Sequence, residues 1–299
     1  MLLNSQTLCF EWLRSKKGKI KPSTYDKYDM ILNKYLLDFF NNYHLDQLDI
    51  SIIKDYFISL LDQGLSSSVV QSIKNVLKAI YITYENQYGL NHIDFSLVKI
   101  EQEKKENASL LDEQFNQLHQ YCLNTIDAIH LGILLAMDTG MMIGEICALK
   151  VSDIDLNKKM ISITKRTQRV KNEERGSKTI YEVADVEWPI KRNIVIPQSL
   201  IQYLEIYLKD KNKNDYLLSN NQHASDFKKL QRGLDKITQQ LGFKTTYKDL
   251  RNMYKEHCMK KCLDVNVVME LLGLQSMKLS LPQNYNSSDE EKIKQVNKL

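Results

Sequence analysis

Apolar residues in the first hundred positions recur at the three- and four-residue spacing of amphipathic helices. One run follows Pro22 and contains Tyr28, Ile31, Leu32, Tyr35 and Leu36. Another follows the GLSSS segment at 64–68 and contains Val69, Ile73, Val76, Leu77 and Ile80. Because this spacing places the apolar side chains on one face of a helix, we predict two long helices within a helical N-terminal unit.

The rest of the chain shows mostly the same helical period, interrupted by a β-rich stretch. We expect helices near residues 111–123, 127–137, 143–149, 199–209, 225–240, 248–261 and 265–272. Residues 160–170 (MISITKRTQRV) and 193–197 (NIVIP) alternate or cluster β-forming residues, as strands do. Between them, 172–189 reads as an extended insertion whose KTIYEV segment is a further strand or a flexible arm. This pattern predicts a mainly α-helical fold with a small β-sheet.

A polar, charge-rich segment divides the chain into two parts. Residues 99–109 (KIEQEKKENAS) are almost devoid of apolar side chains and have the composition of an exposed linker. We therefore predict a helical domain at 1–98, a linker at 99–109 and a second domain at 110–299. At 299 residues, the chain is long enough for each domain to bury its own core.

Composition places the chain among ordinary globular proteins, with 43% hydrophobic and 26% charged residues. No apolar run approaches the ~20 residues of a membrane span, and the first residues lack the pattern of a signal peptide. We therefore expect a cytoplasmic protein without membrane partners.

The five cysteines are odd in number and widely spread, which argues against a disulfide framework. Cys258 and Cys262 lie near His257, but a zinc site lacks a fourth ligand, so unpaired thiols and no metal are the preferred interpretation.

Charge is informative only where it clusters, because the net charge of 41 − 37 = +4 would not identify a nucleic-acid-binding protein. One cluster precedes the first long helix and consists of Arg14, Lys16, Lys17, Lys19 and Lys21. Another lies in the β-rich stretch, where alternation lets Lys165, Thr167 and Arg169 share one face. From the residues alone, each cluster is compatible both with contact to a phosphate backbone and with a basic face that only contacts solvent.

The segment 139–155 (TGMMIGEICALKVSDID) carries the most specific motif of the chain. It resembles the pattern Thr-Gly-x-Arg-x-Gly-Glu of the tyrosine recombinases, or phage-type integrases, which Leu and Ser-Asp-Ile-Asp follow. In that family the Arg binds the non-bridging oxygens of the scissile phosphate. Its position here is occupied by Met142, a thioether that cannot replace a bidentate cation.

A second block, 246–285, resembles the other half of the family's active site. The second Arg of the family's His-x-x-Arg motif corresponds to Arg251, and the His corresponds to Lys248. The Leu-Leu-Gly turn at 271–273 is retained, but the His or Trp donor that follows it in the family is Leu274. The resemblance places the nucleophile at Tyr285, eleven residues after Leu274. Alternatives remain for two of these residues: Arg251 could pair with Glu145 or Asp249, and Tyr285 could be an ordinary exposed tyrosine.

The family's catalytic Lys is carried by a β-hairpin. Integrases of the conjugative-transposon type have Lys-x-Lys-Ser-Ser-x-Arg-x-Ile-Pro before the last strand. Counting back from Pro197, the Lys positions fall on Ile190 and Trp188, and the Arg position on Ile194. The nearest lysine, Lys191, is one residue away, which in a strand turns its side chain to the opposite face.

The resemblance implies a helical core-binding domain followed by an α+β catalytic domain, with duplex DNA and other recombinase protomers as partners and no cofactor. In the family, Tyr attacks a DNA phosphate to form a 3′-phosphotyrosine while the cationic residues stabilise the charge. We expect Met142 and Leu274 to pack against apolar neighbours, and strand cleavage to be impaired. The alternative is an active recombinase that uses Tyr285 with Arg251, Lys248 and unexpected cations such as Lys150 or Lys191. A third possibility is that the chain only engages recombinase protomers, through a C-terminal helix at 288–299.

Overall fold

The chain forms two compact units. The computed structural model describes residues 4–101, 110–171, 179–187, 189–261, 263–274 and 288–298. One unit consists of Met1–Glu106 with Val170–Ile180, and the other of Asn107–Arg169 with Tyr181–Leu299. Most of the predicted linker, 102–109, lies outside the described residues.

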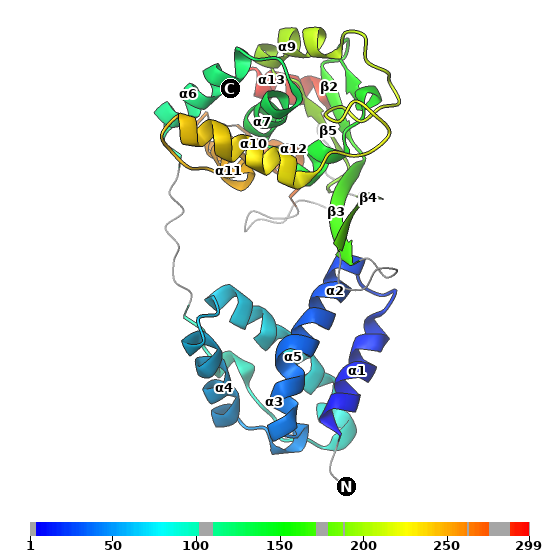
Figure 1. Cartoon of the computed structure of the whole chain (residues 1–299), viewed down its shortest axis with the longest axis vertical. Helices are drawn as coiled ribbons and strands as arrows, with labels where there is room; N and C mark the ends of the chain where they lie inside the picture. Colours follow the sequence, from blue (N-terminus) through cyan, green and yellow to red (C-terminus); the bar gives the residue numbers. More distant parts are fainter. Residues whose placement is uncertain are drawn as a thin grey trace. The chain divides into compact units, whose positions relative to one another are not determined.

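Every regular secondary-structure element within residues 4–101 of the first unit is a helix. Its elements are α1 (Ser5–Lys16), α2 (Pro22–Ile31), η1 (Leu32–Leu36), α3 (Leu37–Asn42), η2 (Leu45–Gln47), α4 (Ile50–Asp62), α5 (Ser67–Tyr88) and η3 (Phe95–Leu97) (Figure 1). The predicted second helix is α5, which ends at Gly89 in the left-handed conformation. The predicted first helix contains a π-helical turn, η1, between α2 and α3. Its apolar residues still face inward, because Ile31, Leu32 and Leu36 are buried with Trp12, Phe57 and Tyr81 in one core.

The second unit is a helical assembly with two small β-sheets. Its helical elements are α6 (Asp112–Leu123), α7 (Ala128–Thr139), α8 (Ile143–Ala148), η4 (Val151–Asp153), α9 (Gln198–Leu208), α10 (Phe227–Gln240), α11 (Tyr247–Lys260), α12 (Val265–Leu272) and α13 (Asp289–Val296). Its strands are β1 (Ile154–Asp155), β2 (Met160–Ile163), β5 (Arg192–Val195) and most of β3 (Lys165–Lys171) and β4 (Thr179–Asp185), whose residues within Val170–Ile180 are grouped with the first unit. The predicted helices and the mainly α-helical class with a small sheet component are confirmed.

The β-rich stretch divides into two sheets rather than one. The order of the first is β1-β2-β5, and its register pairs Ile161 with Ile194; the second pairs β3 with β4. The predicted strand at 160–170 is therefore broken after Ile163, where the Thr164 carbonyl accepts a hydrogen bond from the Val186 amide. The KTIYEV segment is the strand β4, as one of the two alternatives predicted.

Helix α7 forms the centre of the second unit and packs against α6, α10 and α11. The Asp127 side chain caps its start by accepting from the amides of Ile129 and His130, and Gly140 ends it with φ +64°. Residues 131–137 are all buried. This rigid helix delivers the Thr139-Gly140 turn to a fixed place in the fold. None of the helices in the described part of the chain could span a membrane.

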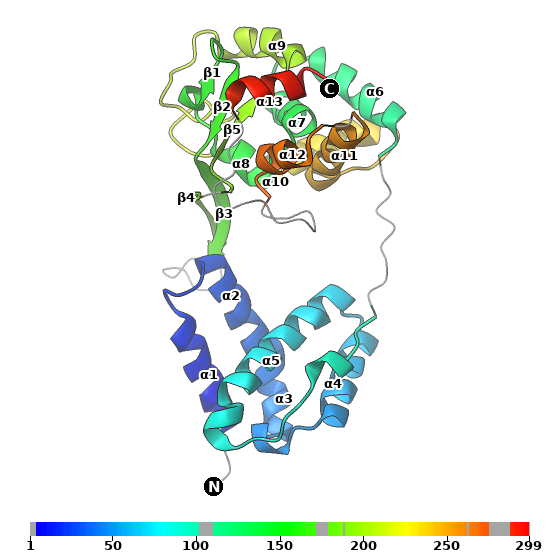
Figure 2. The same ribbon diagram turned by 180° about the vertical axis from the view of Figure 1, so that it is seen from behind.

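The C-terminal helix α13 packs against its own unit, beside α12 and β5 (Figure 2). Lys292 is buried, and its ammonium lies 2.6 Å from the Glu270 carboxylate of α12. Val296 contributes to a small core with Met160, Val195, Val267 and Leu271. The segment through which, as a third possibility, the chain would engage other protomers thus has binding partners within the same chain.

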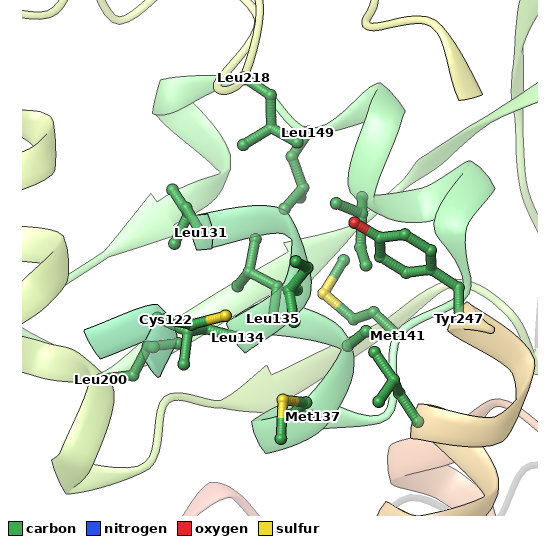
Figure 3. Packing of buried hydrophobic residues seen from close by; sticks show 14 of the residues in the cluster. Cys122, Leu131, Leu134, Leu135, Met137, Met141, Leu149, Leu200, Leu218 and Tyr247 are labelled. Carbon is green, nitrogen blue, oxygen red and sulfur yellow. The ribbon is translucent and has the colours of Figure 1, made fainter. Parts of the chain in front are cut away.

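Tyr247 belongs to the large hydrophobic core of the second unit, together with Leu135 and Met141 (Figure 3), and its hydroxyl oxygen lies 3.4 Å from where a Cβ on Gly132 would be. Within the described residues the buried hydroxyl has no hydrogen-bond partner.

A buried hydroxyl without a partner lowers the free energy of unfolding by about 1–3 kcal/mol. We therefore expect Tyr247→Phe to raise the free energy of unfolding by about 1 kcal/mol. Tyr207→Phe is the matched control, because the buried Tyr207 hydroxyl donates to the Leu217 carbonyl at 3.1 Å. That change should lower the stability by about 1 kcal/mol in the same urea titration; equal losses in both variants would contradict the prediction.

Candidate active site

Arg251 joins the two sequence blocks that resemble an active site. Its Nη1 donates to the Gly140 carbonyl at 2.5 Å, and its Nη2 donates to the Leu272 carbonyl at 2.6 Å. Gly140 precedes Met142 in the first block, and Leu272 precedes Leu274 in the second. A single guanidinium therefore holds together turns that lie more than a hundred residues apart in the sequence.

The start of α11 fixes the position of this arginine. Thr246 caps the helix by accepting from the Asp249 amide at 3.2 Å, and Asp249 accepts in return from the Thr246 amide at 3.0 Å. Arg251 is half-buried, and burial lowers its pKa to about 10, with Glu145 acting in the opposite direction. The side chain is thus still a cation at neutral pH.

A buried ion pair that the sequence analysis missed supports the same turns. Arg192 of β5 binds Glu145 of α8 in bidentate fashion, with Nη1–Oε1 at 2.8 Å and Nη2–Oε2 at 3.0 Å. Its Nε also donates to the Leu271 carbonyl at 2.7 Å, and Glu145 accepts from the Met142 amide at 2.9 Å. The pair therefore connects β5, the Met142 turn and the end of α12.

Two alternatives considered for Arg251 are not observed. Glu145 is bound by Arg192, and Asp249 is bound to Thr246, so Arg251 has backbone partners instead of an ion pair with either acid. The sequence contained a signal for this ion pair. Glu145 lies within the apolar segment 143–149, and a carboxylate buried there requires a cation as its partner. Arg192 also lies two residues before Ile194, the family's Arg position, and so on the same face of the strand.

Two glycines allow the strands β5 and β3 to approach the two motif segments closely. A Cβ on Gly273, which has φ +62°, would lie 2.9 Å from Arg192 Nη1. A Cβ on Gly144 would lie 2.7 Å from the Thr167 carbonyl of β3. Both glycines belong to the resemblance motifs, and their role in this fold is to let the β-strands pack directly against the turns.

Met142 and Leu274 are the two residues that the sequence resemblance aligns with phosphate ligands of the family. Leu274 is half-buried and packs against Tyr254, Cys258, Leu263, Val268 and Leu272. The expected apolar packing is thus confirmed for Leu274. Met142 is also half-buried, but the residue that enters the core beside it is Met141, so this part of the expectation is not confirmed.

The other candidate cations lie at the surface or face elsewhere. Lys248 is exposed one helical turn before Arg251, and Lys191 is exposed, with its backbone amide donating to the Glu187 carbonyl. The ammonium of Lys150 lies 5.3 Å from the centre of the Tyr216 ring. Ile190 is half-buried and Ile194 is fully buried. Tyr285 and Trp188 lie outside the described residues.

The basic clusters differ in their exposure. Arg14, Lys17, Lys19 and Lys21 are exposed, whereas Lys16 is half-buried with its ammonium 5.2 Å from the centre of the Trp12 ring. On β3, Lys165 and Arg169 are exposed, but Thr167 between them is only 3% exposed. Thr167 is buried because its strand packs on Gly144, and contact of the exposed Lys165 and Arg169 with DNA stays a prediction.

The Cys258 and His257 side chains lie in different surroundings. Cys258 is buried, and burial raises its pKa to about 11. The His257 ring lies 3.3 Å from the carboxylate of Asp112, and Cys262 is outside the described residues. Across the described ranges, no group of His, Cys, Asp and Glu residues is arranged to hold a metal ion.

Comparison with solved structures shows the fold. The Tn1549 transposon integrase in complex with transposon right end DNA is similar to this chain, with a TM-score of 0.75 at 16% identity over 92% of this chain and 93% of that one. A lambda integrase dimer bound to a COC′ core site gives a TM-score of 0.65 at 15% identity over 92% and 75% of the respective chains.

Comparison of sequences adds the family. A tyrosine recombinase XerC-like protein of Caldanaerobacter subterraneus subsp. tengcongensis is 26% identical over 89% of this chain and 74% of its own length. The tyrosine recombinase XerA of Pyrococcus furiosus is 25% identical over 94% of this chain and 88% of its own. Residues 6–61 match the N-terminal SAM-like domain of phage integrases, and residues 108–292 match the phage integrase family. Since that match spans more than half of the sequence and includes the turns joined by Arg251, this chain belongs to the phage integrase family of tyrosine recombinases.

Proposed function

We propose that this chain is a recombinase-family protein that binds duplex DNA and has largely lost strand cleavage. The observation that carries the proposal is the composition of the site around Arg251. The turn that precedes α8 presents Met142 where a phosphate-binding Arg is expected, and Leu274 packs into an apolar cluster instead of offering a donor. Removing one transition-state donor costs about 10²–10³-fold in rate, and losing a phosphate-binding Arg about 10³–10⁵-fold.

The same site supports DNA binding. A guanidinium carries five N–H groups, so the backbone bonds of Arg251 leave donors for a phosphate oxygen. The related Tn1549 and lambda integrases were solved on DNA, the latter as a dimer on a core site and as a tetramer on a Holliday junction. Self-association on DNA is accordingly part of the proposal.

Active recombination through Tyr285 is the second candidate. The protonated Arg251, held between the two motif turns, favours it, as does Lys248 one helical turn earlier. A denaturant-resistant protein–DNA adduct that disappears in Tyr285→Phe separates the two candidates.

DNA binding by the N-terminal cluster predicts a defined salt dependence. Each neutralised phosphate contributes a slope of about −0.9 to the plot of log affinity against log salt concentration. Replacing the exposed Lys17, Lys19 and Lys21 by Gln should make this slope shallower by up to about 2.7 and weaken binding to all sequences alike. Fluorescence anisotropy with a labelled duplex measures both effects.

A control with the same change in net charge replaces Lys54, Lys209 and Lys213, which are exposed and lie outside the basic clusters. Its slope should stay close to that of the unchanged protein. Equal slopes for all three proteins would remove the N-terminal cluster from the interface. No salt-dependent binding to any duplex would overturn the proposed function itself.

A further inference from the structure

The first unit contains a cavity of about 410 Å³ between α4 and the helical run of η1 and α3. Its wall includes the aromatic rings of Tyr35, Phe39, Tyr43 and Tyr56 and the carboxylates of Asp38 and Asp55. This volume falls within the range of small-ligand sites in proteins, roughly 300–1,000 Å³. Nothing in the reaction of the family's active site uses these residues.

The aromatic wall is held in place by packing and one hydrogen bond. The rings of Phe39 and Tyr56 stack with their centres 4.2 Å apart, and the centres of Phe39 and Tyr43 lie 5.3 Å apart. The Tyr56 hydroxyl donates to the Tyr35 carbonyl at 2.9 Å, within the π-helical turn. Phe39 is buried, whereas Tyr43 is 38% exposed. Fixed rings of this kind present their faces to an incoming group at little entropic cost.

The charges at the cavity are predominantly negative. Asp38 and Asp55 are exposed, and across residues 4–101 neither carboxylate takes part in an ion pair or side-chain hydrogen bond. Burial raises the pKa of Tyr56, and the negative charge of Asp38 raises this pKa further. The one lysine of the wall, Lys34, places its ammonium 5.2 Å from the centre of the Tyr35 ring. The chain's own cation is thus already attracted to an aromatic face here.

We propose that this cavity binds an organic cation, an alkylammonium or guanidinium group. Aromatic faces attract cations through their quadrupole. The two carboxylates also attract cations, and they repel a phosphate. The cation is either a free amine or the side chain of a lysine or arginine on a protein partner.

Ligand-observed NMR with the full chain tests this site. The probes are agmatine as the free amine and N-acetyl-arginine methylamide as the blocked side chain. The corresponding citrulline compound is the uncharged control, because it keeps the shape and removes the charge. We expect upfield shifts of the methylene signals for both cations, saturating at a Kd of about 1 mM, and no saturable shift for citrulline. Because agmatine carries two positive charges and the blocked arginine one, the source is decided with butylguanidinium, which also carries one: tighter binding of butylguanidinium would identify a free small cation as the ligand, and tighter binding of the blocked arginine a protein side chain.

Variants connect the binding to this cavity. Asp38→Asn and Asp55→Asn should each weaken binding about 2- to 5-fold, and Tyr43→Ala about 2- to 10-fold. Lys34→Gln should strengthen it, since the competing ammonium is lost. Asp62→Asn and Tyr88→Ala are matched controls, because both residues are exposed and lie outside the cavity wall. Equal affinity for citrulline, equal loss in the controls, or no binding of either cation at about 10 mM would overturn the proposal.

Discussion

Arg192→Met lowers the free energy of unfolding of the second unit by about 3–5 kcal/mol, the largest loss we expect from a single substitution in this unit. The reason is that the change leaves the Glu145 carboxylate buried without its cation. It also removes donors from the carbonyls of Leu271 and Ile190, which accept from Arg192 at 2.7 and 2.8 Å. Urea unfolding followed by circular dichroism measures the loss. Lys191→Met is the matched control, because Lys191 is exposed on the adjacent position, and it should change the stability by less than about 0.5 kcal/mol.

A double-mutant cycle separates the ion pair from the other contacts of Arg192. Glu145→Gln alone keeps a side-chain acceptor for the Met142 amide but removes the charge. In the Glu145→Gln/Arg192→Met protein, no charge is left buried, so the combined loss should be smaller than the sum of the single losses by at least about 1 kcal/mol. Additive losses would show that Arg192 stabilises the fold through its backbone bonds alone. A loss below about 1 kcal/mol for Arg192→Met would contradict the role of the pair altogether.

The sequence was sufficient to predict those parts of the fold that depend on local pattern. Helices α7 and α12 follow from apolar periodicity, and both end at a glycine with positive φ, Gly140 and Gly273. The class of the fold followed from the balance of such segments. The π-helical turn at 32–36 escaped prediction because its apolar positions are compatible with a regular α-helix, and only the packing of the finished unit distinguishes the two.

The parts of the site that could not be predicted depend on partners distant in sequence. Arg192 and Glu145 are 47 positions apart; the apolar surroundings of Glu145 indicate a buried cation, but they do not identify which residue supplies it. The burial of Thr167 between the exposed Lys165 and Arg169 results from contact between β3 and Gly144, and strand alternation alone could not predict it. The position of Arg251, by contrast, followed from its motif. Motifs place a residue along the chain, but its hydrogen-bond partners are set by tertiary packing.

Under the proposed function, introducing phosphate ligands at Met142 and Leu274 should raise covalent adduct formation more than any other change. Met142→Arg with Leu274→His places a cation and a donor on turns that Arg251 and Arg192 already fix. Together they should increase the rate of Tyr285-dependent adduct formation by about 10³-fold or more, because the phosphate-binding Arg alone is worth about 10³–10⁵. The Leu274 change withdraws a side chain from the cluster around Tyr254, so a stability measurement accompanies the assay.

The assay requires a DNA site that the protein itself selects, so duplexes enriched by repeated binding come first. A nicked suicide duplex carrying the selected site then traps the adduct, which is read as a gel shift resistant to denaturant. Met142→Gln with Leu274→His is the matched control, since it adds polarity at both positions without the cation, and its rate should stay at least about tenfold below that of the Arg variant. Tyr285→Phe in the restored protein should abolish the shift. Robust Tyr285-dependent trapping by the unchanged chain would contradict impaired cleavage, and it would show that Arg251 and Lys248 hold the phosphate without the first Arg of the family.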